Sequence, residues 1–297
     1  MTTPLFMALA LGATPVSATS VALPAPAEWV EFRSATASPT PFALKRAEAQ
    51  GIKLKANLGA PRRGLLFHPV GNGPFPELVL LHGCDGIQPY QRLRGDRLAA
   101  HGYVALLPDS FGPRGVQGDC AAWRSESDVQ PNDAFGALTY LRGLSFVDPA
   151  RVAVLGWGTG GHAVLLAVDD KGARQLFGQQ RFAAGVALYP TFTAVRRPSA
   201  PLLVLLGGAN DCVPAAQVER ALGDVEPGPF TPRLEVLPDA AHGFDDPRYT
   251  RPVHREKTQY CLAWPAAEGA TVAYSQTAQE IAAGQVRAFL DEHLKQR

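Results

Sequence analysis

The chain has 297 residues, 46% of them hydrophobic, and a formal net charge of +1 from 28 basic and 27 acidic residues. A chain of this length and composition can bury a large hydrophobic core without disulfide or metal cross-links. The balanced charge and the lack of basic runs exclude nucleic acid as an expected partner.

The N-terminal segment is apolar. Leu5–Ser17 has the length of a signal-peptide core, and Val16-Ser17-Ala18 supplies small residues for cleavage. We predict a signal peptide over residues 1–18 and export, with the periplasm as the expected compartment. Met1–Pro4 lacks a basic residue, so a disordered apolar tail is the alternative. The stretch is too short to be a membrane anchor.

The rest of the chain alternates between strand and helix patterns. Residues 19–62 are expected to add edge strands, near 29–34 and 52–57, to a single domain over 63–297 that opens with a strand near 64–68. Strands are then predicted at 77–81, 103–107, 152–156, 184–189, 202–206 and 233–237, with helices at 91–101, 131–143, 160–169, 215–222 and 276–295. This alternation predicts an α/β fold with a mostly parallel central sheet and helices on both faces.

The most informative motif is Gly156-Trp157-Gly158-Thr159-Gly160, between a buried strand and an apolar helix. This is the layout of a nucleophile elbow, G-x-Ser-x-G, with Gly158 at the nucleophile position. A shifted frame would make Thr159 the nucleophile. That frame places Trp157 where the turn requires a small residue, and a β-branched residue where the backbone is unusual. We therefore assign the vacant nucleophile position to Gly158.

The other members of a hydrolase triad follow in the expected order. Asp211 lies in the loop after the apolar run Pro201–Leu206, and His242 lies in the loop after the next strand. In α/β-hydrolases the chain order is nucleophile, acid, histidine. We expect Asp211 to be the acid and His242 the base.

An oxyanion hole is also predicted. Glu77–Leu81 is followed by His82-Gly83-Cys84, and such a loop donates one backbone N–H while the residue after the nucleophile donates the other. The donors would be the amides of Cys84 and Thr159. Three aromatic residues are expected either to line a substrate pocket or to pack in the hydrophobic core: Trp157, Tyr189 and Phe244.

Four stretches together resemble the dienelactone hydrolase family of α/β-hydrolases. They are Leu80–Gly86, His101–Gly115, Phe146–Arg151 and Ala240–Phe244, and the resemblance covers roughly residues 63–295. It implies hydrolysis of a small ester or lactone. The chain departs from the family at Gly158, where the nucleophile is cysteine or serine, and at Gly83, which takes the place of a glutamate of the type enzyme.

Four cysteines fit an exported chain. The expected pairs are Cys84–Cys120 and Cys212–Cys261. The alternative is that Cys84 is free and is a relocated nucleophile.

Three interpretations of the glycine remain open. The chain is a non-catalytic binder of an ester-like or carboxylate ligand, or an enzyme in which His242 activates water, or a point variant of a serine enzyme. A scaffold protein without a pocket beside His242 is a further class. We expect no metal and no cofactor. Gly156–Gly161 is a loose glycine-rich pattern, but no acidic residue closes a following strand about twenty positions on, as a dinucleotide site requires. The oligomeric state stays open.

Overall fold

The computed structural model describes residues 25–36, 41–51, 59–116, 120, 129–191, 195–256 and 269–295. The predicted signal peptide and the predicted strand near 52–57 lie outside these residues. Among the described residues no helix is both long and apolar enough to cross a membrane.

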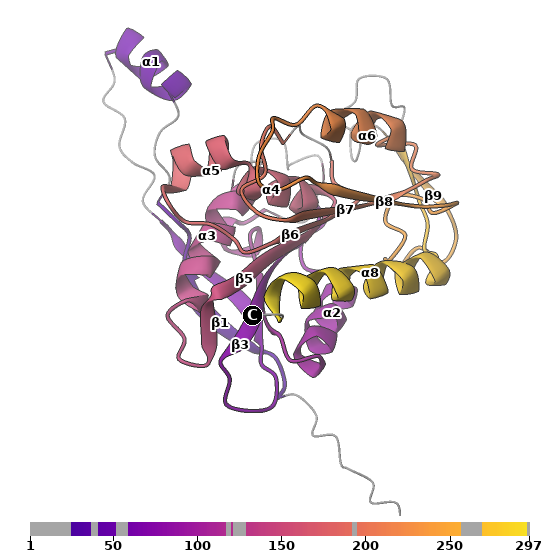
Figure 1. Ribbon diagram of the computed structural model, residues 1–297, viewed down its shortest axis with the longest axis horizontal. Helices are drawn as coiled ribbons and strands as arrows, with labels where there is room; N and C mark the ends of the chain where they lie inside the picture. The colour runs from indigo at the N-terminus through magenta and orange to yellow at the C-terminus, as the bar shows by residue number, and fades with distance from the viewer. Residues whose placement is uncertain are drawn as a thin grey trace, which may run out of the picture.

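An eight-stranded sheet forms the centre of the fold, in the order β1-β2-β4-β3-β5-β6-β7-β8 (Figure 1). The first two strands pair antiparallel, β2 pairs antiparallel with β4, and every pair from β4 to β8 is parallel. The strands are β1 (Glu28–Arg33), β2 (Pro61–Phe67), β3 (Phe75–Leu81), β4 (Val104–Pro108), β5 (Val147–Trp157), β6 (Gly185–Leu188), β7 (Leu202–Gly207) and β8 (Arg233–Leu237).

Helices cover both faces of the sheet, as predicted. Figure 1 shows α2 (Pro89–Ala100) and α8 (Gln276–Leu294) on one face, with α3 (Val129–Leu141) and α4 (Thr159–Val168) on the other. The central strands are buried on both faces, which explains their unbroken apolar runs. The described residues also include the helices α1 (Pro41–Ala49), α5 (Asp170–Phe177) and α6 (Ala215–Gly223).

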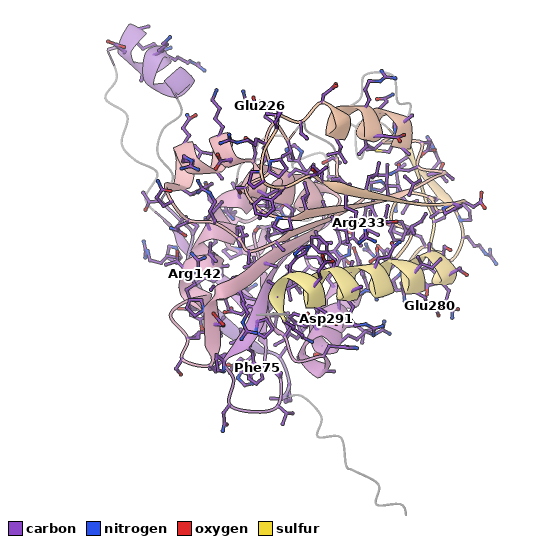
Figure 2. The ribbon with its side chains drawn as sticks, in the orientation of Figure 1. Phe75, Arg142, Glu226, Arg233, Glu280 and Asp291 are labelled. Atoms are coloured by element: carbon purple, nitrogen blue, oxygen red, sulfur yellow. A yellow bond between two sulfur atoms is a disulfide. The ribbon has the colours of Figure 1, made fainter. Side chains whose placement is uncertain are left out.

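Some elements were not predicted. β9 (Val253–Glu256) and β10 (Gly269–Val272) form a separate antiparallel pair, and their four-residue length gives little periodic signal. β5 begins at Val147, five residues before the predicted start, because Phe75 of β3 already pairs with Val147. Figure 2 shows Phe75 at the bottom of the view, where β3 begins.

Candidate active site

The turn from β5 to α4 has the backbone of a nucleophile elbow, with Gly158 at its apex. Gly158 has φ 56° and ψ −112°, a combination that side-chain-bearing residues adopt only under strain. Its carbonyl accepts hydrogen bonds from the amides of His162 (3.0 Å) and Thr191 (3.2 Å). The apex is therefore fixed from the helix on one side and from the loop after β6 on the other.

The flanking glycines set the frame of the motif. A Cβ at Gly156 would clash with the backbone of Gly160, and a Cβ at Gly160 would clash with the carbonyls of Leu81 and His82. Strand and helix thus approach closely two residues before and two residues after Gly158. The geometry centres the elbow on Gly158 rather than on Thr159.

There is room for a side chain at Gly158. A Cβ built there meets no atom within 4 Å outside its chain neighbours. The space opens into a cavity whose walls include Cys84, Thr159, Trp157, Tyr189 and His242, all of which were predicted site residues. A scaffold protein is expected to lack a cavity beside His242, and the structure has one.

Two predicted residues do not line this cavity. Phe244 is fully buried, with its ring edge-on to Tyr189 at 5.2 Å between centroids, so it lies in the core behind the wall. Asp211 lies at an exposed position, where it acts on His242 through its charge.

His242 is buried, and burial is the larger influence on its ionisation. Removal from water lowers the pKa of His242 to about 4, although the nearby negative charge of Asp211 acts in the opposite direction. The imidazole is therefore neutral at pH 7 and can accept a proton. Its ring lies 5.0 Å from that of Tyr189, in an edge-on arrangement.

Thr271 of β10 holds the carboxylate of Asp211. Its backbone amide donates to Oδ1 at 2.8 Å, and its hydroxyl donates to Oδ2 at 2.6 Å. The same strand reaches the histidine loop, since His242 bridges Val272 and its carbonyl accepts from the amide of Ala273. Strand β10 and the residue after it therefore contact both Asp211 and the loop that carries His242.

The loop with the Cys84 amide is fixed by buried polar contacts. The His82 ring contacts the Gly83 carbonyl through Nδ1 (2.7 Å) and accepts from the Ser110 amide through Nε2 (3.2 Å). Gln130 donates to the His82 carbonyl at 2.8 Å. Burial lowers the pKa of His82, so this histidine is a neutral structural residue.

A disulfide between Cys84 and Cys120 ties the same loop to the segment after β4, which confirms the first predicted pair. Cys84 therefore has no free thiol, and the relocated-nucleophile alternative is wrong. Cys212 is also disulfide-bonded. Its predicted partner, Cys261, lies outside the described residues.

A buried carboxylate lies behind the cavity wall. Asp245 accepts hydrogen bonds from the Tyr189 hydroxyl (2.6 Å) and from Trp157 Nε1 (3.0 Å), and its nearest cation is Arg94 at 3.6 Å. Burial raises the pKa of Asp245, against the opposing effect of Arg94. Sequence reasoning missed this residue, although it directly follows the His242-Gly243-Phe244 motif.

Arg248 links the two loops that frame the cavity. Its guanidinium bonds Asp246 and Asp85 and donates to Gln88 Oε1 at 2.8 Å. Asp85 belongs to the loop with the predicted oxyanion donor, and Asp246 to the loop with His242. Two carboxylates thus neutralise the cation on the cavity wall. The sequence offered no signal for the contact between Arg248 and Asp85, because these residues are 163 positions apart.

The described residues contain no group of three or more histidine, cysteine, aspartate or glutamate side chains that could hold a metal ion.

A parallel sheet with an elbow after a central strand, and a histidine from a loop after the last sheet strand, defines the α/β-hydrolase class.

Comparison of the chain with known proteins identifies its family. The model of the dienelactone hydrolase family matches residues 63–293, and the chain belongs to this family. A Methylorubrum extorquens protein provisionally named a carboxymethylenebutenolidase is 25% identical over 199 residues, which cover 59% of this chain and 65% of that protein.

Solved structures show the same fold. A dienelactone hydrolase-like promiscuous phosphotriesterase from metagenomic libraries has a TM-score of 0.63 at 19% identity, over 91% of this chain and 99% of that one. An esterase of Thermogutta terrifontis has a TM-score of 0.54 at 14% identity, over 78% of this chain and 88% of that one.

Proposed function

We propose that the chain hydrolyses small neutral esters or lactones by direct attack of a water molecule that His242 activates. The observation that carries the proposal is the Gly158 elbow, which has hydrolase geometry and opens into the cavity lined by His242. An acyl-enzyme cannot form on Gly158, because glycine has no nucleophilic atom in its side chain.

The cavity wall also has polar groups that suit a water molecule. The hydroxyls of Thr159 and Thr191 are buried and have no hydrogen-bond partner among the described residues. Both residues line the cavity beside Gly158. A buried water requires about two to four polar partners, and these hydroxyls together with the His242 imidazole supply that number.

The reaction follows from these groups. His242 removes a proton from water while the water oxygen bonds to the ester carbonyl carbon. The resulting oxyanion is stabilised by the amides of Cys84 and Thr159. When the tetrahedral intermediate collapses, the carbon–oxygen bond to the alcohol breaks, and the imidazolium returns the proton to the departing alkoxide. The products are a carboxylic acid and an alcohol.

Charge at the cavity favours an uncharged substrate. Arg248, the cation on the wall, already bonds Asp85 and Asp246, so a substrate carboxylate would have to displace an internal carboxylate. Lactones and esters without an acidic group therefore fit this site better than anionic ones.

The test is hydrolysis of p-nitrophenyl acetate from pH 6 to 9 by the parent chain and by His242→Ala, with His293→Ala as the histidine control. We expect His242→Ala to lower the rate by about 10²-fold, the lower range for a general base, and His293→Ala to leave it unchanged. Because the pKa of His242 is about 4, the His242-dependent rate should be flat from pH 6 to 8.

Product release should show no burst, and the protein should gain no acetyl mass. Equal rates in the parent and His242→Ala would overturn the proposal. The site would then be that of a non-catalytic binder of an ester-like or carboxylate ligand.

A further inference from the structure

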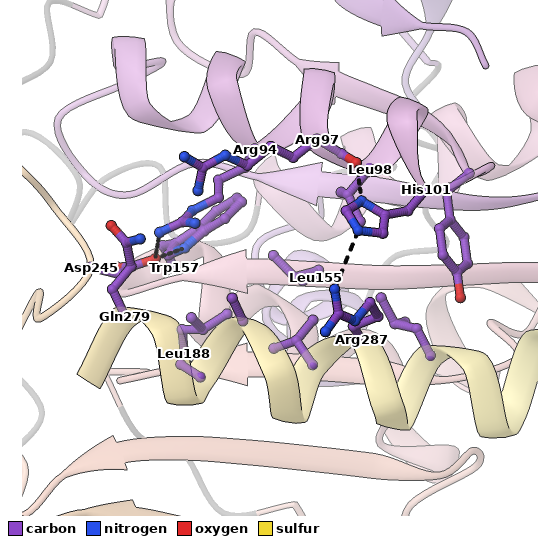
Figure 3. Close-up of a pocket in the computed structure, with 15 residues that line it drawn as sticks. Arg94, Arg97, Leu98, His101, Leu155, Trp157, Leu188, Asp245, Gln279 and Arg287 are labelled. Atoms are coloured by element: carbon purple, nitrogen blue, oxygen red, sulfur yellow. Dashed lines mark hydrogen bonds and ion pairs between the residues drawn. The ribbon is translucent and has the colours of Figure 1, made fainter. Parts of the chain in front are cut away.

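A second pocket lies between α2 and α8, and it shares Trp157 of the elbow motif with the cavity beside Gly158. Its volume is about 130 Å³, and its lining is mainly apolar, with Leu98, Leu155, Leu188, Val286 and Leu290 among its residues. Figure 3 shows Leu155 and Leu188 of the sheet between the side chains of the two helices. An apolar cavity near 150 Å³ is large enough to bind benzene, so this pocket suits a short alkyl chain or one aromatic ring.

Most of the charged residues of the pocket are cationic. Arg94 and Arg97 come from α2 and Arg287 from α8, and Figure 3 shows the two helices carrying them on opposite sides of the pocket. Asp245 is the acidic lining residue, and it is already bonded to Tyr189, Trp157 and Arg94. The lining therefore has an excess of positive charge.

Two of these arginines are available to a ligand. Arg97 and Arg287 lie at exposed positions, and neither has an ion pair with a carboxylate within 4.0 Å among the described residues. Arg287 donates to Nε2 of His101 at 3.3 Å, and Nδ1 of His101 contacts the Arg97 carbonyl at 2.6 Å. His101 thus connects the two arginine-bearing helices at the pocket.

We propose that this pocket binds an apolar monocarboxylate of short-chain alkyl or aryl size. The tail would pack between α2 and α8 against Leu155 and Leu188, and the carboxylate would bind Arg97 and Arg287. Arginine is well suited to this role, because its planar guanidinium can donate two parallel hydrogen bonds to a carboxylate. Such binding depends on the apolar lining and the arginine charges and is independent of the hydrolase activity.

The test is a ligand-observed NMR titration of the full chain with hexanoate, and with hexanol as the uncharged match. We expect saturable hexanoate binding and at least tenfold weaker hexanol binding. Arg97→Gln combined with Arg287→Gln should weaken hexanoate binding about tenfold, through the loss of charged hydrogen bonds. Arg92→Gln is the control, because Arg92 is an exposed arginine of α2 that does not line the pocket.

A second variant separates this pocket from the catalytic cavity. Ala283 lines the pocket yet lies at an exposed position, so Ala283→Phe should fill the pocket and leave the fold intact. We expect Ala283→Phe to abolish hexanoate binding, with the melting temperature near that of the parent. Absence of saturable binding, or binding that Ala283→Phe and the arginine substitutions leave unchanged, would overturn the proposal.

Discussion

Thr271 binds both oxygens of the Asp211 carboxylate, with its amide at 2.8 Å from Oδ1 and its hydroxyl at 2.6 Å from Oδ2. This contact orients a carboxylate that lies at an exposed position, where water would otherwise compete for it. The charge of Asp211 in turn acts on His242. Thr271 is thus a positioning residue for the acid of the proposed site.

Substitution Thr271→Val removes the hydroxyl bond and keeps the backbone bond and the side-chain shape. We expect ester hydrolysis to fall by about 3- to 10-fold, the equivalent of one hydrogen bond, with little change in melting temperature. The rates are best measured in the Gly158→Ser background. Thr139→Val, which removes a hydroxyl bond to the Phe135 carbonyl, is the control. An unchanged rate in Thr271→Val would show that Thr271 does not position Asp211 for the reaction.

The Cys84–Cys120 disulfide spans 36 positions and anchors the loop of the predicted oxyanion donor. We expect the double variant Cys84→Ser, Cys120→Ser to lose about 2–4 kcal/mol of unfolding free energy, measured by urea denaturation without reductant. Esterase activity in the Gly158→Ser background should fall as well, because the Cys84 amide loses its fixed position. Parent-like stability would show that the loop needs no covalent anchor.

Glu77 of β3 is buried without a hydrogen-bond partner for either carboxylate oxygen among the described residues. Burial raises the pKa of Glu77 to about 9, partly offset by Arg142, and Figure 2 shows Arg142 on the side of α3. The folded state therefore holds a proton that the unfolded state releases near pH 4.5. The contribution of Glu77 to the free energy of unfolding is therefore fully present below pH 4.5 and is lost as the pH rises toward 9.

Substitution Glu77→Gln removes this pH dependence. At pH 8 we expect the free energy of unfolding of the variant to exceed that of the parent by about 1–3 kcal/mol. The difference should shrink toward pH 5. Glu219→Gln, at an exposed position of α6, is the control and should have no such effect. Identical pH–stability curves for the parent and Glu77→Gln would contradict a protonated Glu77.

The sequence alone predicted the sheet strands from 64 onward. The central parallel strands among them are buried and stand out as continuous apolar runs. It also pointed to Gly158, Asp211 and His242 as the candidate elbow, acid and base, since these come in a fixed chain order in hydrolases of this fold, and their catalytic roles stay predictions. It missed Thr271, Asp245 and Arg248. These residues act through contacts between distant segments, and no local periodicity marks them.

The β9–β10 pair illustrates the limit. Each of its strands has only four residues and little alternation of apolar and polar positions, yet Thr271 of β10 supplies the hydrogen bonds to Asp211. The basic pocket between α2 and α8 is another case. The apolar stripe of α8 predicted packing on the sheet, but only the structure shows that arginines of α2 and α8 line the same pocket.

The most direct test of the account is p-nitrophenyl acetate hydrolysis by Gly158→Ser beside Gly158→Ala. Both variants carry the same backbone strain at φ 56°, and only serine supplies a hydroxyl. We predict that Gly158→Ser hydrolyses the ester at least about 10²-fold faster than Gly158→Ala, with a burst of product from an acyl-enzyme. A folded Gly158→Ser variant no faster than Gly158→Ala would contradict the assignment of this turn, with His242 and the loop amides, as a hydrolase site that lacks only its nucleophile.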